Sequence, residues 1–281
     1  SDISQYPDSN GHYLRSKLAE KFNVKMDNVI LGAGSEGIMA TIMRTFLNEG
    51  DHILATENSF IGFRVLANAS GKKVDWISMK NYNYDLEGMS EAICKNTKII
   101  YLANPDNPTG SYFNKNDFDK FIEKVPNRCL VILDEAYYEY ASSIKDYPDS
   151  MHYRFDNVIT LRTFSKAYGL AGLRVGYGFA HDKLISSLMK VKLPFEPSVP
   201  AQIAALAALS DQDHLEQTLN LNLKLQQIEL CHKKIFHHPS FTILIPLYII
   251  LGDYNNCVRF EPIRRHFLAA DDLGLYSAIL R

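Results

Sequence analysis

Short apolar runs alternate with longer amphipathic stretches between Val29 and His181. Strands of a parallel sheet are covered on both faces, so they appear in a sequence as continuous apolar runs, and the stretches between them form the covering helices. The pattern therefore predicts an α/β fold: a mostly parallel seven-stranded sheet with helices on both faces. The seven predicted strands lie in the segments VILGAG, HILATE, KVDWISM, KIIYLANP, CLVILDEAY, NVITLRTF and GYGFAH.

Helical periodicity is clearest in two segments between these runs. Residues 36–47 predict one helix, and residues 114–125 predict another that has Asn114 as its N-cap. The apolar face of the second helix consists of Phe118, Phe121, Ile122 and Val125. After residue 182 the pattern becomes helical, and the long stretch 201–236 predicts either one bent helix or two.

Composition narrows the kinds of partner that the chain can have. Its 281 residues carry 30 basic and 32 acidic side chains, and the resulting net charge of −2 provides no overall field that would attract nucleic acid. The longest apolar run, at 241–251, is too short to span a bilayer, and residues 1–10 lack the features of a secretory signal. The four cysteines form no CxxC pair, which is typical of reduced thiols. We expect a cytoplasmic protein that binds a small ligand, with no nucleic acid or membrane partner.

Polar residues follow five of the predicted strands, at the positions where ligands bind to open α/β sheets. Each such segment alone is a common structural feature, but five in one domain predict a ligand site at the carboxyl edge of the sheet. The segments are AGSEG (33–37), TENSF (56–60), ANPDNPTG (103–110), DEAYYEY (134–140) and RTFSK (162–166).

The stretch FSKAYGLAGLRVGY places Lys166 and Arg174 among small, aromatic and apolar residues. A lysine that loses its proton through burial beside another cation can condense with an aldehyde. Arg174 and the glycine turn at 32–37 suit a phosphate dianion, together with the hydroxyl groups of Ser35, Thr163 and Ser165. Asp134, at the end of a buried strand, can keep a ring nitrogen protonated. An aldehyde, a phosphate and a basic ring nitrogen together describe pyridoxal 5'-phosphate (PLP).

Three segments of the chain also resemble those of a known family. NPDNPTG, DEAYYEY and FSKAYGLAGLRVGY are similar to segments of fold-type I PLP-dependent aminotransferases, most of all histidinol-phosphate aminotransferases, and their order agrees from about Tyr6 to Leu209. The resemblance implies an N-terminal dimer-contact segment at 1–28, a large PLP-binding domain at 29–209 and a small α+β domain at 210–281 that is atypical or incomplete. It also implies a homodimer with shared active sites.

The resemblance further implies a role for each site residue. Lys166 is the Schiff-base lysine that also moves the substrate proton, and Asp134 is the partner of the pyridine nitrogen. Asn107 and Tyr137 bind the phenolic oxygen of the cofactor, and Phe60 stacks on its ring. Tyr6 reaches the cofactor phosphate of the neighbouring subunit. The phosphate cup consists of Ser35, Glu36 through its backbone amide, Thr163, Ser165 and Arg174.

The implied activity is the transfer of an amino group from histidinol phosphate, or from an aromatic or related amino acid, to a 2-oxo acid such as 2-oxoglutarate. A threonine-phosphate decarboxylase-like enzyme of the same fold remains an alternative, because these motifs bind cofactor and do not select the reaction. A trimmed, catalytically impaired PLP-binding protein is a third possibility, since the N-terminal substrate lid of the family has no counterpart here. In the loosely matching tail we expect Arg265 and Arg281 to bind the substrate anion. His232, His237 and His238 are interpreted as a solvated helix end rather than a metal site.

Overall fold

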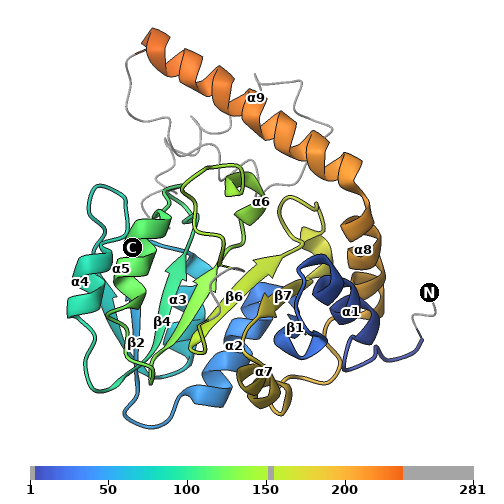
Figure 1. Cartoon of the computed structure of the whole chain (residues 1–281), viewed down its shortest axis with the longest axis horizontal. Helices are drawn as coiled ribbons and strands as arrows, with labels where there is room; N and C mark the ends of the chain where they lie inside the picture. The colour runs from blue at the N-terminus through green and yellow to red at the C-terminus, as the bar shows by residue number, and fades with distance from the viewer. Residues whose placement is uncertain (1–3, 151–154, 237–281) are drawn as a thin grey trace, which may run out of the picture.

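The computed structural model describes residues 4–150 and 155–236, with side chains described up to residue 225. Its centre is a seven-stranded sheet with the strand order β1-β7-β6-β5-β4-β2-β3 (Figure 1). β7 is antiparallel to both of its neighbours, and the other strand pairs are parallel. The predicted mostly parallel sheet is confirmed, and each predicted segment contains one strand. The strands are β1 (Val29–Gly32), β2 (His52–Thr56), β3 (Lys73–Ile77), β4 (Thr97–Ala103), β5 (Leu130–Asp134), β6 (Val158–Thr163) and β7 (Gly176–Phe179).

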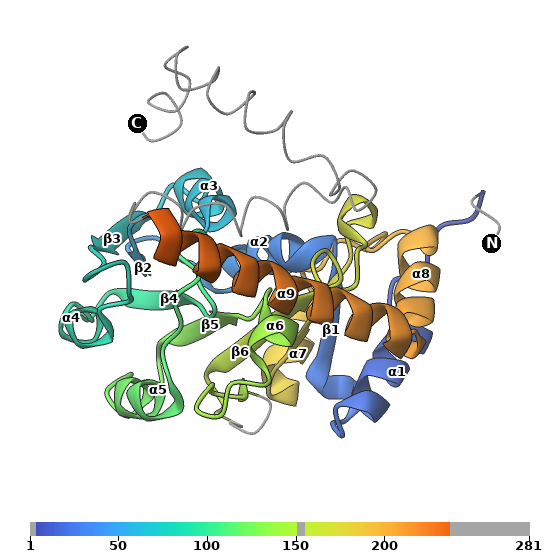
Figure 2. The same ribbon diagram turned by 90° about the horizontal axis from the view of Figure 1, so that it is seen from above.

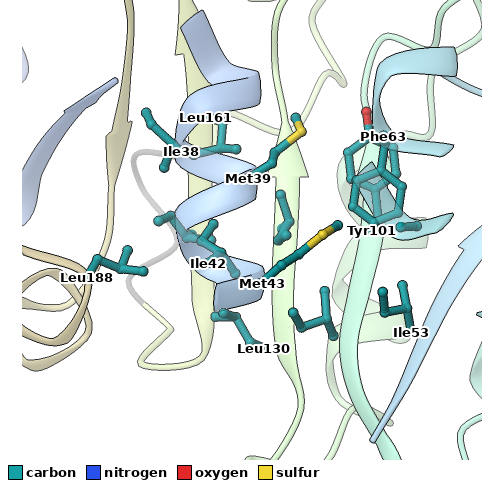
Figure 3. Packing of buried hydrophobic residues seen from close by; sticks show 14 of the residues in the cluster. Ile38, Met39, Ile42, Met43, Ile53, Phe63, Tyr101, Leu130, Leu161 and Leu188 are labelled. Atoms are coloured by element: carbon teal, nitrogen blue, oxygen red, sulfur yellow. The ribbon is translucent and has the colours of Figure 1, made fainter. Parts of the chain in front are cut away.

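Helices cover both faces of this sheet. On one face, α2 buries Ile38 and Ile42 against strand residues such as Leu161, as Figure 3 shows. Neighbouring residues along a strand point to opposite faces, so Ile30 joins this layer and Leu31 joins the other one. The first layer consists of α2 (Gly34–Phe46), α3 (Ile61–Ala69) and α7 (Asp182–Met189). The second consists of α1 (His12–Lys21), α4 (Leu86–Glu91), α5 (Lys115–Ile122) and α8 (Val199–Ser210).

Local sequence explains where the predicted helices begin and end. The Asn114 side chain accepts a hydrogen bond from the backbone N–H of Asp117 at 2.9 Å, which confirms it as the N-cap of α5. The helix ends at Ile122, three residues earlier than expected, because Pro126 disfavours helical backbone at Val125. Val125 is nevertheless buried with the other three residues of the predicted face.

The long helical stretch forms two helices. Asp211 has φ −88° and ψ 75°, outside the helical region, and it separates α8 from α9 (Gln212–Phe236). Its side chain accepts a hydrogen bond from the backbone N–H of His214 at 3.0 Å and so caps the second helix. α9 crosses over the short helix α6 (Tyr138–Ala141), and the two are in contact (Figure 2). The proposed domain boundary at 209/210 stays a prediction.

A buried ion pair links the ends of β5 and β6. The Arg162 Nη2 atom lies 2.8 Å from Glu135 Oε2, and both side chains are fully buried. The guanidinium also lies 3.3 Å from the centroid of the Tyr138 ring. Burial raises the pKa of Glu135, while the charge of Arg162 acts in the opposite direction. The ion pair therefore holds the strand ends that carry Asp134 and Thr163.

We expect Arg162→Met to lower the free energy of unfolding by about 3 kcal/mol, because it leaves a buried carboxylate without its partner. Without the arginine, the pKa of Glu135 lies further above its unfolded value, so the folded state holds this proton to a higher pH. The loss in the free energy of unfolding should therefore be smaller at pH 5 than at pH 8. Urea unfolding at both pH values measures it. Lys17→Met, which removes an exposed ion pair with Glu20, is the control and should change stability by less than about 0.5 kcal/mol. An equal loss at both pH values would contradict the explanation.

Candidate active site

A cavity of about 330 Å³ lies at the carboxyl edge of the sheet. Asp134 ends β5, Thr163 ends β6 and Ala103 ends β4, and these strands are parallel, so their ends meet there. β1 is antiparallel to β7, which is antiparallel to β6, so β1 also ends at this edge. Every predicted cofactor-binding residue except Tyr6 lines the cavity: Ser35, Glu36, Phe60, Asn107, Asp134, Tyr137, Thr163, Ser165, Lys166 and Arg174.

The N-terminus of α2 forms one wall of this cavity. Gly34 has φ +74°, which strains any residue with a side chain, and a Cβ atom there would lie 2.7 Å from Arg174 Nη2 and displace the arginine. A Cβ atom on Gly176 would lie 2.5 Å from the backbone nitrogen of Ser35. The N-cap residue of α2, Ala33, has no side chain that caps the helix, and no other described side chain accepts from its first N–H groups. These N–H groups therefore remain available to an anion.

Arg174, which lies just before β7, also contributes to this anion site. Its Nη1 atom donates to Ser165 Oγ at 3.3 Å, and Thr163 Oγ1 donates to Ser165 Oγ at 3.0 Å. Its Nη2 atom forms an ion pair with Glu36 Oε2 at 3.1 Å, with both side chains about half exposed. The guanidinium, the hydroxyl groups and the helix N-terminus together suit a phosphate dianion. The Glu36 carboxylate, which the sequence did not predict as a partner of Arg174, competes for the same guanidinium.

Lys166 lines the same cavity as the anion site. Its Nζ atom is 5.2 Å from the centroid of the Tyr137 ring. Burial lowers the pKa of Lys166 and the charge of Arg174 lowers it further, whereas Asp134 raises it. A larger fraction of this amine is therefore unprotonated than for an exposed lysine. Such an amine can act as a nucleophile and as a base.

Asp134 is almost completely buried in the cavity wall. Its Oδ2 atom accepts a hydrogen bond from the Tyr101 hydroxyl at 2.9 Å, while Oδ1 has no hydrogen-bond partner among the described residues. Burial raises the pKa of this carboxyl to about 6. A buried carboxylate oxygen without a partner is costly, so the site favours a ligand that brings a hydrogen-bond donor.

Two further predicted residues meet in the lining of the cavity. The Asn107 side chain donates to the Tyr137 hydroxyl at 2.9 Å, which places an amide and a phenol side by side. Burial, the largest effect, and the nearby Asp134 charge raise the pKa of Tyr137, so its hydroxyl stays protonated. Phe60 precedes α3 and lines the same cavity. This pair offers polar contacts to an oxygen, and Phe60 offers a flat apolar surface.

A hydrogen-bond network behind the cavity holds the loop that carries Asn107. Ser59 Oγ donates to Asp106 Oδ1 at 2.5 Å and lies 2.9 Å from the hydroxyl of Tyr84. That hydroxyl accepts from the backbone N–H of Ala103 at 2.9 Å. The sequence did not predict this network, nor Tyr101 as the partner of Asp134. Ser59 and Asp106 lie in segments that follow strands, but Tyr84 and Tyr101 lie outside those segments and carried no signal.

One predicted site residue lies elsewhere, and two others fall outside the described residues. Tyr6 does not line the cavity: its side chain is 78% exposed, and its ring stacks on that of Phe195 with a centroid separation of 4.2 Å. Arg265 and Arg281 lie outside the described residues, as do His237 and His238. His232 is in α9, beyond the described side chains.

This architecture is that of the fold-type I PLP-dependent transferases. A crystal structure of histidinol-phosphate aminotransferase from Sinorhizobium meliloti, in complex with pyridoxal-5'-phosphate, shares it with a TM-score of 0.74 and 31% sequence identity, over 80% of this chain and 62% of that one. The model of the family "Aminotransferase class I and II" matches residues 1–236. The chain therefore belongs to the class I and II aminotransferase family.

Curated relatives narrow the similarity further. The chain is 43% identical over 225 residues to histidinol-phosphate aminotransferase of Caldicellulosiruptor saccharolyticus, which covers 79% of this chain and 63% of the relative. It is 39% identical over 219 residues to histidinol-phosphate aminotransferase 2 of Carboxydothermus hydrogenoformans, which covers 77% of this chain and 60% of the relative. The chain thus spans somewhat less than two thirds of the length of these relatives. Among the residues that the structure describes, none of the helices has the length and apolar character needed to cross a membrane.

Proposed function

We propose that the chain is a PLP-dependent aminotransferase that moves the amino group of histidinol phosphate, or of a related donor, to a 2-oxo acid such as 2-oxoglutarate. The observation that carries the proposal is the combination, in one cavity, of a lysine with a lowered pKa, a buried carboxylate oxygen without a partner, and an anion site. Membership of the family and the names of the curated relatives support the same activity and donor.

The residues of the cavity fit PLP. The anion site of Ser35, Thr163, Ser165 and Arg174 suits the phosphate group, and the Lys166 amine suits the aldehyde. The unpartnered Oδ1 atom of Asp134 suits a protonated ring nitrogen, which would supply the missing hydrogen-bond donor. When bound, PLP supplies an electron sink for the bonds at the substrate Cα.

The chain's own residues then have separate tasks. With PLP and substrate bound, the Lys166 amine would take the proton from the substrate Cα and return it to the carbon of the former PLP aldehyde, because the amine combines basicity with a fixed position. Asp134 would keep the ring nitrogen charged, and Tyr101 fixes the orientation of its carboxylate through the 2.9 Å hydrogen bond. Asn107 and Tyr137 would bind the ring oxygen. Arg265 and Arg281 remain the predicted residues for the substrate anion.

Half-reaction spectroscopy tests the proposal. The purified protein should show the absorption of lysine-bound PLP, and histidinol phosphate added without an acceptor should remove this absorption and yield one carbonyl product per site. Adding 2-oxoglutarate should then restore the absorption and yield glutamate. Release of carbon dioxide with no change in the cofactor would show a decarboxylase instead. Bound PLP with no response to any amino donor would indicate a catalytically impaired PLP-binding protein.

We further propose a cytoplasmic homodimer in which Tyr6 binds the PLP phosphate of the partner subunit. The exposure of Tyr6, and of Phe195 beside it, supports this proposal, because two large apolar rings gain stability when a second chain covers them. The mass of the native protein in analytical ultracentrifugation tests the dimer. The cytoplasmic location rests on the sequence and stays a prediction.

We expect Tyr6→Phe to lower the affinity for PLP roughly tenfold or more, because a hydrogen bond to a charged phosphate contributes about 1.5 to 3 kcal/mol. The dimer should persist, since the ring is kept. A fluorescence titration of PLP into the cofactor-free protein measures the effect. Tyr13→Phe, which alters another exposed tyrosine near the N-terminus, is the control and should bind PLP as the parent does.

A mixed dimer locates the action of Tyr6. One subunit carries Tyr6→Phe and the other carries Lys166→Ala. If Tyr6 acts across the interface, one site combines an intact Lys166 with an intact Tyr6, and activity at low PLP concentration returns to half of the parent value. If Tyr6 acts within its own chain, no site in this dimer has both residues, and activity stays low.

A further inference from the structure

A group of three potential metal ligands lies at the amino edge of the sheet, opposite the edge that carries the cavity. His52 is the first residue of β2, Asp75 is the third residue of β3, and Cys94 lies between α4 and β4. The three strands are parallel, so their amino ends meet at this edge. None of these residues has a part in the function proposed above. No sequence motif marks them, because they come from three separate segments.

The three side chains direct acceptor atoms toward one point. His52 Nδ1 lies 2.9 Å from Asp75 Oδ2 and 3.8 Å from Cys94 Sγ, and the three ligand atoms all lie within 4.8 Å of one another. A neutral imidazole nitrogen can share only one proton with these two acceptors, so His52 can donate to Asp75 Oδ2 or to Cys94 Sγ but not to both. A divalent cation at this point would accept lone pairs from all three atoms at once.

The separations are close to those of a tetrahedral zinc site. Bond lengths of about 2.0 to 2.3 Å to nitrogen, oxygen and sulfur place the ligand atoms of such a site about 3.4 to 3.6 Å apart. The observed separations of 2.9 and 3.8 Å on His52 lie on either side of this value, and the separation between Asp75 and Cys94, within 4.8 Å, would shorten as the two side chains turn toward an ion. The His52 and Asp75 side chains are 17% and 23% exposed, which leaves an opening for the ion and for a fourth, water ligand.

Backbone contacts fix the cysteine before any ion binds. The Cys94 N–H donates to Thr97 Oγ1 at 2.9 Å, and its carbonyl oxygen accepts from Arg128 Nη2 at 2.7 Å. The N–H of His52 donates to the carbonyl oxygen of Asn96 at 2.9 Å, which ties the start of β2 to the same turn. Two of the three ligands are therefore held in place, and little conformational entropy is lost when the ion binds.

The charges around the group also suit a cation. Thr97 Oγ1 donates to Cys94 Sγ at 3.5 Å, and this hydrogen bond stabilises negative charge on the sulfur. Metal ions bind the thiolate form. The other oxygen of Asp75, Oδ1, forms an ion pair with Lys73 Nζ at 2.9 Å. The Lys73 side chain is 65% exposed, so solvent screens the repulsion between its charge and an incoming cation.

We propose that His52, Asp75 and Cys94 form a structural binding site for one zinc-like divalent cation, which ties together the amino ends of β2, β3 and β4. A nitrogen, a sulfur and a carboxylate oxygen are the ligand types that Zn²⁺ takes in proteins, and a thiolate excludes Mg²⁺ and Ca²⁺ as preferred ions. The site lies outside the active-site cavity, so cation binding leaves amino-group transfer unchanged.

Cobalt titration of the reduced PLP-loaded protein tests the site. Co²⁺ replaces Zn²⁺ and reports a tetrahedral thiolate environment through its ligand-field absorption. We expect one Co²⁺ per chain with this signature, and at least about tenfold weaker binding in Cys94→Ser, in His52→Ala and in Asp75→Asn. Zn²⁺ at on the order of 100 times its Kd should raise the Tm of the parent by about 5 °C or more.

Matched variants separate this site from other metal ligands of the chain. Cys129→Ala removes the buried thiol, and His12→Ala removes a histidine outside the group; both should bind Co²⁺ as the parent does. Near-native circular dichroism of each variant guards against a folding defect. The proposal is overturned if the parent shows no tetrahedral Co²⁺ signature, or if the signature survives Cys94→Ser. It is also overturned if Zn²⁺ raises the Tm of the parent and of Cys94→Ser equally.

Discussion

Lys166→Ala should abolish the covalent link between the protein and PLP and lower the rate of amino transfer by at least about 10⁴-fold, or about 5.5 kcal/mol in activation free energy. The alanine provides neither the amine that binds the aldehyde nor the base that moves the substrate proton. The fold should persist, because the change removes a partly buried charge and adds none. Borohydride reduction followed by peptide mapping measures the link, and single-turnover kinetics measure the rate.

Two other lysines provide internal controls for this experiment. Burial lowers the pKa of Lys21 and of Lys192, as it does for Lys166, but neither lines the cavity. If a lowered pKa were sufficient for reaction with the aldehyde, the label would appear on these residues too. We expect it on Lys166 alone. A label on Lys21 or Lys192 at the level of Lys166 would show that the position of the amine in the cavity does not decide the reaction.

The sheet could be predicted because most of its strands are apolar on both faces; the edge strand β3 is only partly buried. Segments such as HILATE and CLVILDEAY have no helical period and lie between stretches that do, so their assignment is unambiguous. Helix ends were less predictable. The end of α5 depends on the proline at 126, and the division between α8 and α9 depends on the capping side chain of Asp211. Both features concern single residues, whereas periodicity averages over many.

The composition of the cavity wall was predictable for a topological reason. Residues that follow parallel strands converge at one edge, so the sequence predicted which residues lie together without any knowledge of distances. Partners that come from within a strand were not predictable in this way. Tyr101 reaches Asp134 because its strand, β4, pairs with β5 in a register that only the structure shows. The pairing of Arg162 with Glu135 likewise required the register of β5 and β6.

The position of Tyr6 illustrates a different limit. Its predicted task needs a second subunit, and within one chain its ring packs on Phe195 at the surface. Local sequence does not show whether a side chain acts in the active site of its own subunit or in that of the partner subunit. The mixed-dimer experiment addresses this directly, because only an arrangement across the interface lets two defective chains form one complete site.

Asp134→Asn should lower the rate of amino transfer by on the order of 10³-fold, or about 4 kcal/mol, while PLP still binds. The asparagine keeps the shape of the carboxylate and still accepts the hydrogen bond from Tyr101. Its amide cannot hold a proton on the ring nitrogen, because the amide itself donates to that nitrogen. The electron sink therefore loses its positive charge. Single-turnover kinetics with a saturating amino donor measure the loss.

The pH dependence of PLP binding separates this electrostatic role from a packing role. Burial raises the pKa of Asp134 in the empty cavity to about 6, so below this pH the carboxyl holds a proton that a cationic ring must displace. The affinity of the parent for PLP should therefore fall as the pH drops through 6. Per pH unit, this fall should be up to about tenfold greater than the fall for Asp134→Asn. The phosphate of PLP titrates in the same range, but equally for both proteins. Asp106→Asn is the control for the rate measurement, since this buried carboxyl also has a raised pKa but does not line the cavity. The rate of amino transfer in this variant should fall by less than about tenfold. Identical pH profiles for the parent and for Asp134→Asn would show that the carboxylate does not bind a charged ring.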